Sequence, residues 1–252
     1  AMGFSPEDQV RRIIRYAQDH KFNRFSALAP DNLYGRRMVK ALRESIKEEN
    51  SLSKEAAYYL EETQNLTRTI KTFADYNRRR NELLYQRRKL AERGDDISKR
   101  ALRKLGKHET LGKVGFNALL LPAGGRQILR VAPLLAFYDV DPSQVKYLGT
   151  SNWAEEALNS EPSLVGAWFV APSIKKRQFF VDKFKKNFGR VPTRQASLAY
   201  DSTALVVFLA QRTLGNKKAG VKVFTTKALT SPSGFSGVDG IFRLLSSGLV
   251  ER

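Results

Sequence analysis

Three short segments of the sequence place amides, hydroxyls, aromatic rings and glycines directly after apolar runs. They are Pro30-Asp31-Asn32-Leu33-Tyr34-Gly35, Pro122-Ala123-Gly124-Gly125 and Thr150-Ser151-Asn152-Trp153. Groups of this kind bind and orient a small polar molecule. Because the segments contain no histidine, cysteine or carboxylate pair, the chemistry that they favour is binding rather than catalysis.

Each segment taken alone is also explained as a tight turn, since glycine, asparagine and proline make turns without any ligand. The apolar runs before them are strand-like, and the carboxyl ends of parallel strands share one edge of a sheet. We therefore expect the three turns to converge on one crevice. The predicted ligand-binding residues are Asp31, Asn32, Tyr34, Gly35, Pro122, Gly124, Gly125, Ser151, Asn152 and Trp153.

Other patterns for catalysis or metal binding are missing from the sequence. His20 and His108 have no second histidine or carboxylate at a metal-ligand spacing, so we expect both to be solvated. The nucleophile-elbow, P-loop and dinucleotide-binding patterns are absent. The chain has no cysteine, which excludes disulfides and thiolate chemistry. We predict no enzyme, no cofactor and no metal.

The segments that must position the turns alternate between strand and helix patterns. Ser5 and Pro6 are typical of a helix start, and an apolar stripe at Val10, Ile13, Ile14 and Ala17 follows them. Strands are expected at 25–29, 56–60, 116–121, 145–149 and 164–173, helices at 36–49, 126–139, 175–189 and 197–214, and a hairpin of short strands in the tail. This alternation predicts an α/β fold with a mostly parallel sheet flanked by helices.

Residues 66–106 have a different texture and predict a charged helical hairpin that is half packed and half solvated. The apolar stripes are Phe73, Tyr76, Leu83 and Leu90, interrupted by Arg80 and Arg87, and then Ile97, Ala101, Leu102 and Leu105, with Gly94 and Asp95 or Asp96 between the helices. Residues 68–107 contain fourteen Lys or Arg and five Asp or Glu, which is +9 of the chain's net +19. Such charge suggests an anionic partner. Nucleic acid is not expected, because the basic residues are scattered around the helix.

Seven segments spread over almost the whole chain carry a resemblance to a known family. They are GFSPEDQVRRI, FSALAPDNLYGRR, FNALLLPAGG, VKYLGTSNW, LVGAWFVAP, FGRVPTRQASLAYDSTALV and GFSGVDGIFR. In this order and spacing they resemble the type I periplasmic binding proteins, the Leu/Ile/Val-binding class of solute receptors. Within that superfamily the chain is most similar to the penicillin-binding-protein activator branch of bacterial envelope lipoproteins, and its basic hairpin also looks like that branch.

The resemblance implies two α/β lobes that close on a ligand around a hinge. Residues 4–172 would form the second lobe, with the basic hairpin at about 66–106; residues 173–230 would be helices of the first lobe, and residues 231–252 would return to the hinge and the second lobe. The first lobe would be incomplete in this chain. The apolar helix 197–214, expected to be buried, would then lack its partner, so a dimer contact or another chain is expected to cover it.

The function implied by the resemblance is non-enzymatic binding in the periplasm or cell envelope, with a lipid anchor in a segment absent from this chain. A small polar ligand or a penicillin-binding protein would be the partner, in support of peptidoglycan synthesis, and the basic hairpin would meet an anionic envelope polymer or lipid. The alternative is a substrate-binding component of an ABC transporter for amino acids or similar solutes. The family's ligand contacts fall on Tyr34, the Pro-Ala-Gly-Gly turn and Ser151 to Trp153. Its acidic ammonium-binding residue has no match before Glu155, which leaves the ligand open.

Overall fold

The computed structural model describes residues 5–46, 56–60, 62–171, 174–214 and 224–251 of the chain. It divides into two compact units, one taking in Gln9–Val170 and the other Ala171–Arg252 together with the first residues of the chain. The two units have separate hydrophobic cores. Among the described residues, no helix has the length and apolar character needed to cross a membrane.

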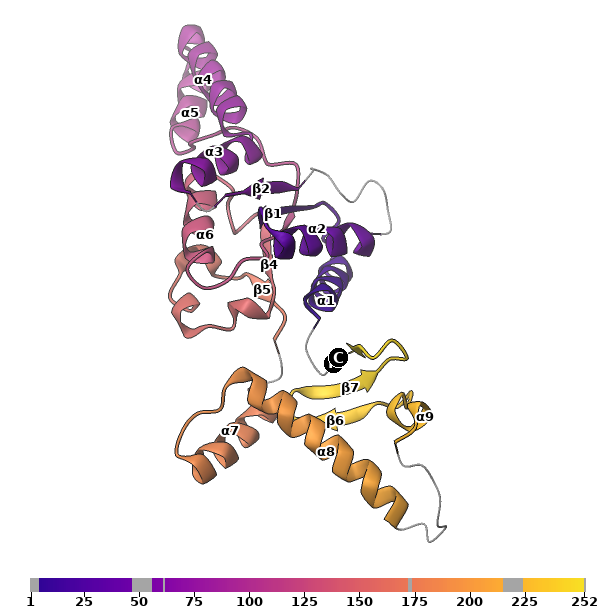
Figure 1. The fold of residues 1–252 in the computed structure, drawn as a ribbon. Coiled ribbons are helices and arrows are strands. Elements are labelled where there is room, and N and C mark those ends of the chain that lie inside the picture. The colour runs from indigo at the N-terminus through magenta and orange to yellow at the C-terminus, as the bar shows by residue number, and fades with distance from the viewer. Residues whose placement is uncertain (1–4, 47–55, 61, 172–173, 215–223, 252) are drawn as a thin grey trace. The chain divides into compact units, whose positions relative to one another are not determined.

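The unit Gln9–Val170 is built on a five-stranded sheet in the order β2-β1-β3-β4-β5 (Figure 1). Its strands are β1 (Phe25–Pro30), β2 (Ala57–Tyr59), β3 (Ala118–Leu120), β4 (Lys146–Gly149) and β5 (Trp168–Phe169). Every neighbouring pair is parallel. The chain goes from β1 outward to β2 and then adds β3, β4 and β5 on the other side of β1. The direction of winding therefore switches between β1 and β3.

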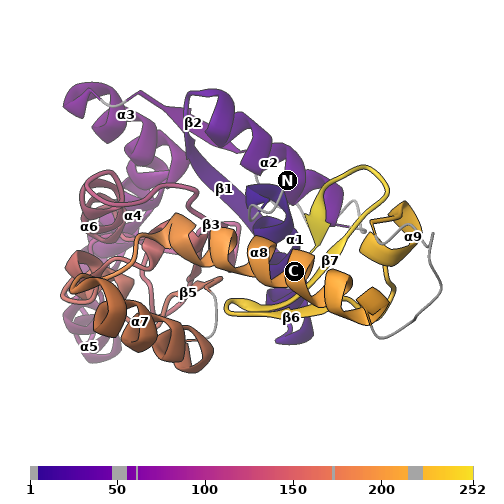
Figure 2. The ribbon, with the colours of Figure 1, turned by 60° about the horizontal axis from the view of Figure 1, so that its bottom comes forward.

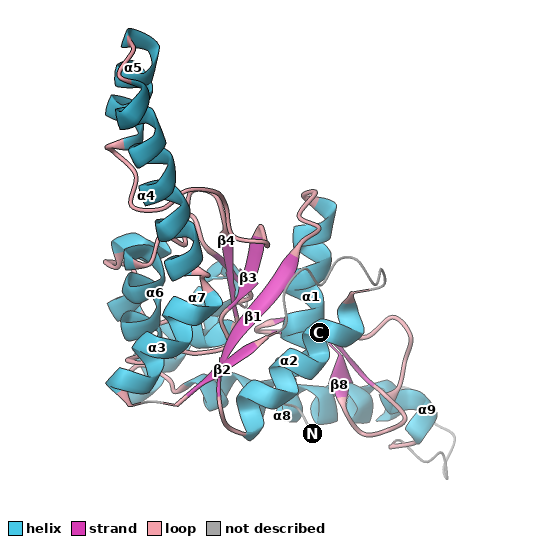
Figure 3. Ribbon diagram, turned by 90° about the horizontal axis from the view of Figure 1, so that it is seen from above, coloured by secondary structure: helices cyan, strands magenta, loops and turns pink. Residues whose placement is uncertain are grey.

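Helices cover both faces of this sheet, as Figure 3 shows. One face is covered by α1 (Pro6–Asp19) and α2 (Leu33–Ser45), and the other by α3 (Thr63–Phe73) and α6 (Ile128–Phe137). Successive side chains of a strand point to opposite faces. In β1, Leu28 accordingly packs with α3 and α6, while Ala27 and Ala29 pack with α1 and α2. The predicted α/β fold with a parallel sheet between helices is confirmed.

The first helix begins where the sequence predicts. Pro6 is the first residue of α1, and the Ser5 Oγ accepts a hydrogen bond from the Asp8 N–H at 3.3 Å. The predicted apolar stripe faces the core, since none of its four side chains is more than 4% exposed. A capping hydroxyl and a helical apolar period together were enough to locate this helix.

The second helix begins earlier than predicted. It starts at Leu33 rather than Arg36, because the Asn32 carboxamide caps it by accepting the Gly35 N–H at 2.9 Å. It ends at Ser45, and the predicted helical residues 47–49 lie outside the described part of the chain. The polar turn after β1 is therefore shorter than the sequence suggested, and Tyr34 belongs to the first turn of a helix.

The charged hairpin predicted over 66–106 is shorter in the structure. It is formed by α4 (Tyr76–Arg93) and α5 (Asp96–Leu105), which stand away from the sheet of their unit (Figure 3), whereas residues 66–73 belong to α3 and pack on the sheet. Gly94 ends α4 with a φ of 63°, and Asp95 caps α5 by accepting the Ser98 N–H at 2.8 Å. One predicted packing residue is wrong: Ile97 is 80% exposed. Ser98, which is buried, takes the side of α5 that faces α4.

A buried arginine, which the sequence pattern did not reveal, fixes the base of the hairpin. Arg79 is 4% exposed, and its guanidinium donates to the carbonyls of Ala74, Gly112 and Asp139 at 3.1–3.3 Å. It also forms an ion pair with the Asp139 carboxylate at 3.3 Å. Burial lowers the pKa of Arg79, and the negative charge of Asp139 opposes that shift. The planar group holds α4 against the segments that follow α5 and α6.

The other unit combines helices with an antiparallel sheet, and Figure 2 shows α8 running beside its strands. Its elements are α7 (Ile174–Phe188), α8 (Arg194–Leu214), α9 (Thr226–Leu229), β6 (Phe235–Gly237), β7 (Gly240–Leu244) and β8 (Val250–Glu251). The strands pair in the order β6-β7-β8, as the turn-rich tail predicts. Leu205 and Leu209 of α8 pack on Phe242 and Val250 of this sheet.

Several apolar side chains of this unit are more exposed than the helix patterns predict. Val206, Val207 and Phe208 of α8 are 51%, 47% and 47% exposed. Phe179 and Phe188 of α7 are 74% and 64% exposed. Among the described residues, Leu205 and Leu209 of α8 pack on the strands β6–β8, and the Phe208 ring lies 6.2 Å from that of Phe235, whereas the side of α8 that carries Val206 and Val207 stays about half exposed. The prediction that helix 197–214 is buried is therefore wrong for that side.

The last strand of the parallel sheet is shorter than predicted. A strand was expected over 164–173, whereas β5 covers Trp168–Phe169; residues 172–173 lie outside the described part of the chain. A short 3-10 helix at Pro162–Leu164 and a left-handed Gly166, with a φ of 81°, precede it. The first residues of the apolar run therefore form turns, and the strand that pairs with β4 consists of Trp168 and Phe169.

Candidate functional site

The three polar turns lie side by side at the carboxyl edge of the parallel sheet. Strands β1, β3 and β4 are adjacent, so the turns that follow them are neighbours. The Tyr34 hydroxyl lies 3.1 Å from the Thr150 Oγ1, and it accepts a hydrogen bond from the Asn152 Nδ2 at 3.3 Å. The turn after β3 packs directly against the turn after β4, because a Cβ on Gly124 would lie only 2.6 Å from the Cβ of Asn152. The predicted convergence of the turns is confirmed.

A polar cavity of about 240 Å³ opens between these turns. Six of the predicted residues line it, namely Asn32, Tyr34, Pro122, Gly124, Gly125 and Asn152. Pro30, Ala123, Gln127 and Glu155 complete the lining. The cavity lies where the winding of the sheet switches between β1 and β3. Open α/β sheets bind their ligands outside the strand ends at such a switch point.

Two of the predicted residues in the first turn act on the backbone. The Asn32 side chain is engaged as the cap of α2, although it also lines the cavity. A Cβ on Gly35 would lie 2.0 Å from the Pro30 carbonyl oxygen, so a residue with a side chain cannot take this place without moving the backbone. Gly35 therefore lets α2 start directly on the end of β1, and it does not line the cavity.

Three further predicted residues do not line the cavity. Asp31 is ion-paired with Arg36 on the surface. The Ser151 backbone N–H donates to the Gln9 Oε1 at 2.8 Å, which ties the third turn to α1. Trp153 is 4% exposed and belongs to the core on the α3 and α6 side of the sheet. Each of these residues has a structural partner of its own.

The indole of Trp153 joins the second and third turns through contacts in the core. Its Nε1 donates to the Ala123 carbonyl at 2.6 Å. Its ring lies against Gly149, where a Cβ would be 2.2 Å from the ring. A side chain at position 149 would push the indole out of this place, so the close approach requires glycine. Trp153 thus holds the Pro-Ala-Gly-Gly turn in place relative to the end of β4.

Two functional candidates were not placed in the site from sequence. Gln127 lies where the second turn enters α6, and it lines the cavity. Glu155 is exposed, and its Oε2 lies 3.2 Å from the position of a Cβ on Gly125. Glu155 reaches the second turn because the chain runs through the short 3-10 helix Ser151–Trp153, which no local sequence pattern indicated. Glu155 gives the cavity a carboxylate that can accept hydrogen bonds from a ligand's cationic or amide group.

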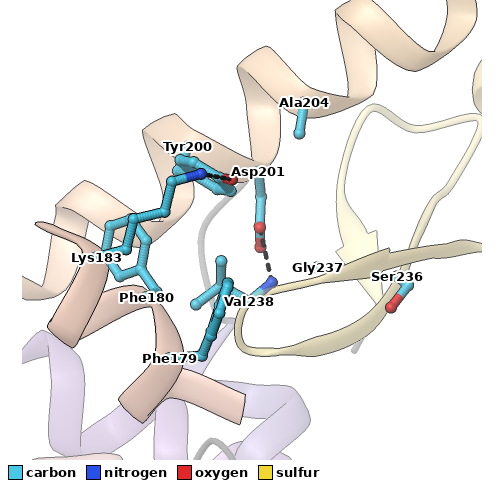
Figure 4. Close-up of a pocket in the computed structure, with 9 residues that line it drawn as sticks. All are labelled: Phe179, Phe180, Lys183, Tyr200, Asp201, Ala204, Ser236, Gly237 and Val238. Carbon is cyan, nitrogen blue, oxygen red and sulfur yellow. Dashed lines mark hydrogen bonds between the residues drawn. The ribbon is translucent and has the colours of Figure 1, made fainter.

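The other unit contains cavities of a different character. One of about 380 Å³ lies between α7, α8 and the turn joining β6 to β7, with Phe179, Phe180 and Tyr200 around it (Figure 4). Its carboxylate is already engaged, because the Asp201 Oδ1 accepts the Val238 N–H at 2.8 Å. A second cavity, of about 450 Å³, lies on the Phe208 side of α8. Both are mainly apolar gaps beside a packed helix, so the polar cavity at the sheet edge is the better candidate for a ligand site.

The chemistry of the polar cavity is that of binding. Its side chains supply amides, a phenol and one carboxylate, all of which form hydrogen bonds. Within the part of the chain that the structure describes, no group of three or more His, Cys, Asp and Glu side chains could hold a metal ion. His20 lies against Tyr16 and Trp168, with ring centroids 4.2 and 5.1 Å away.

No protein-family profile and no curated protein sequence matches the chain. Solved structures do share its fold. A structure from Rhodospirillum rubrum assigned to a branched-chain amino acid ABC transporter matches with a TM-score of 0.67 and 12% identity, over 100% of this chain and 62% of that one. A branched-chain amino acid ABC transporter periplasmic ligand-binding protein from Burkholderia xenovorans matches with a TM-score of 0.58 and 13% identity, over 100% and 57%.

A third match is the C-domain of LpoA from Haemophilus influenzae, a regulator of PBP1A. Its TM-score is 0.54 and its identity 15%, over 99% of this chain and 63% of that one. The chain therefore shares the fold of these solved structures, which is that of the type I periplasmic binding proteins. It spans between 57% and 63% of the length of the three solved chains.

Proposed function

We propose that the chain is a non-catalytic binding module of the bacterial envelope, and that the polar cavity at the sheet edge is its binding site. The observation that carries the proposal is the meeting of three turns from adjacent strands around Tyr34, Asn152 and Gly124. Two of the similar structures belong to ABC transporter proteins and the third to a regulator, which supports binding as the common activity. In this proposal residues 4–172 act as the second lobe, residues 173–230 as helices of the first, and residues 231–252 as the return to the hinge.

The role that we favour is support of peptidoglycan synthesis through contact with a penicillin-binding protein. It rests on the likeness to the LpoA C-domain, which regulates PBP1A and is similar over 99% of this chain. A lipid anchor outside the given sequence would hold the module at the membrane. The Tyr34 hydroxyl already has Thr150 and Asn152 as partners, so the turns are held in place before anything binds, which suits a preformed docking surface.

The absence of cysteine from the sequence makes a direct test simple. A single Gln127→Cys substitution places a thiol at the cavity, and Lys40→Cys places a matched thiol on the exposed side of α2. Each variant is labelled with a bulky maleimide, and its binding to the soluble part of a penicillin-binding protein is followed by biolayer interferometry. We expect the label at position 127 to abolish binding and the label at position 40 to leave it unchanged. Equal binding by both labelled proteins would contradict the proposal.

A second candidate is the substrate-binding component of an ABC transporter for amino acids or similar solutes. The observation that favours it is the Glu155 carboxylate at the cavity, which can pair with a ligand's ammonium group. A thermal-shift screen over amino acids and other polar metabolites tests it. A ligand present at about 100 times its Kd stabilises a protein by about 2.7 kcal/mol. We expect Glu155→Gln to remove the shift given by amines, and no shift across the panel would rule this candidate out.

A further inference from the structure

The outer face of α5 carries charge of almost one sign. Lys99, Arg100, Arg103 and Lys104, with Lys107 in the turn that follows, are all exposed. They recur at the three- and four-residue spacings that place side chains on one face of a helix. The opposite face, formed by Ser98, Ala101, Leu102 and Leu105, is buried or half-buried. Asp96 is the acidic residue on the outer face, and it lies 3.5 Å from Lys99.

The neighbouring helix does not share this pattern. On α4 the exposed Arg88 and Lys89 lie between Glu82 and Glu92 in the sequence. The exposed Arg78, Arg80 and Arg93 are ion-paired with Asp75, Glu109 and Asp95. Other α4 arginines are engaged within the hairpin: Arg87, for example, donates to the carbonyls of Leu105 and His108 at 2.7 and 2.8 Å. A helix face that serves solubility alone mixes both signs of charge. The one-signed face of α5 therefore indicates an anionic partner.

An exposed isoleucine at the edge of this face narrows the choice of partner. Ile97 is 80% exposed at the start of α5, and the helical period places it beside Arg100, three residues further on. The phosphates of nucleic acid attract cations, but they make no favourable contact with an aliphatic side chain. The interface of an anionic bilayer binds both kinds of side chain, since its headgroups attract the cations and its acyl boundary accommodates an apolar side chain.

We propose that the outer face of α5 docks on an anionic lipid surface, with Ile97 entering the interface and the five basic side chains meeting lipid phosphates. This proposal does not depend on what the polar cavity binds. Five cations less Asp96 leave a net of four positive charges on the face. At about a fivefold gain in partition for each charge near the surface, anionic vesicles should bind several hundredfold more strongly than neutral ones.

Vesicle flotation with the full 252-residue chain tests the proposal. Phosphatidylcholine vesicles with and without about one third phosphatidylglycerol are compared at low salt. We expect binding to the anionic vesicles, and a loss on the order of a hundredfold in a variant with Arg100→Gln, Arg103→Gln and Lys104→Gln. Ile97→Ser should weaken vesicle binding severalfold with the charge unchanged.

The matched control removes three exposed cations elsewhere in the same unit, with Arg12→Gln, Arg15→Gln and Arg68→Gln. It should change vesicle binding by less than about threefold. If the control loses as much binding as the α5 variant, net charge rather than this face is responsible and the proposal fails. It also fails if anionic vesicles do not bind. A short DNA duplex that binds better than the vesicles, with no effect of Ile97→Ser, would assign the face to nucleic acid instead.

Discussion

Replacing Trp153 by phenylalanine separates a structural role of this indole from a role in touching a ligand. The change removes the hydrogen bond from Nε1 to the Ala123 carbonyl, which is 2.6 Å long and buried. A buried carbonyl left without its donor costs about 1–3 kcal/mol of folding free energy. The smaller ring also leaves space beside Gly149, worth roughly 1 kcal/mol at about 24 cal/mol per Å³ of cavity. We expect a total loss of about 2–4 kcal/mol.

Urea unfolding followed by circular dichroism measures this loss without relying on tryptophan fluorescence. Trp168→Phe is the matched control, because Trp168 is half-buried at the sheet edge and a phenyl ring keeps its edge contacts with Tyr16 and Phe22. The control should lose at most about 1 kcal/mol. If Trp153→Phe costs less than about 0.5 kcal/mol, as exposed substitutions do, or no more than the control, then the indole does not hold the second turn and the reasoning is refuted.

Three further changes test the supports of the site and the hairpin. Arg79→Met should lower the free energy of unfolding by about 3 kcal/mol, because it leaves the carbonyls of Ala74, Gly112 and Asp139 without the guanidinium donor; urea midpoints measure the loss, and an unchanged midpoint would contradict the anchoring role. Gly124→Ala should cost about 1–3 kcal/mol, since its Cβ would lie 2.6 Å from that of Asn152, and a neutral result would show that the two turns do not touch. The Ser98 N–H bond lowers the pKa of Asp95 below its ordinary 3.8, so the cap stabilises α5 above that pH and is lost as pH falls through the lower folded-state value. Amide NMR signals of residues 96–105 should then broaden on acidification, whereas the Asp95→Asn protein keeps them unchanged.

The part of the fold that the sequence predicts well depends on local chemistry and simple periods. Ser5 and Pro6 located the start of α1, and the stripe beginning at Val10 located its buried face. The three strand-end turns were brought together by one rule of parallel sheets, that carboxyl ends share an edge. This rule needs no knowledge of side-chain packing. It explains why residues 34 and 152, far apart in sequence, were placed in one site.

The errors arise where tertiary packing decides between equivalent local choices. The sequence neighbours of Trp153 do not show whether its ring points into a crevice or into the core. The ring lies in the core because Gly149 has no side chain there to displace it. Arg79 looks like any other arginine of α4, because its carbonyl partners come from segments beyond the helix. Helical period alone cannot say that Phe179 is exposed, since exposure depends on what packs against α7. Residues at such positions need three-dimensional contacts to be assigned.

We propose that this chain binds its partner, whether a protein or a small solute, in the cavity between the three turns. Hydrogen exchange measured with and without the bound penicillin-binding protein, or with the solute that gives the largest thermal shift, tests it most directly. We expect slowed exchange in peptides covering residues 30–35, 122–127 and 150–155 together. Protection confined to other segments, with these three turns unchanged, would contradict it.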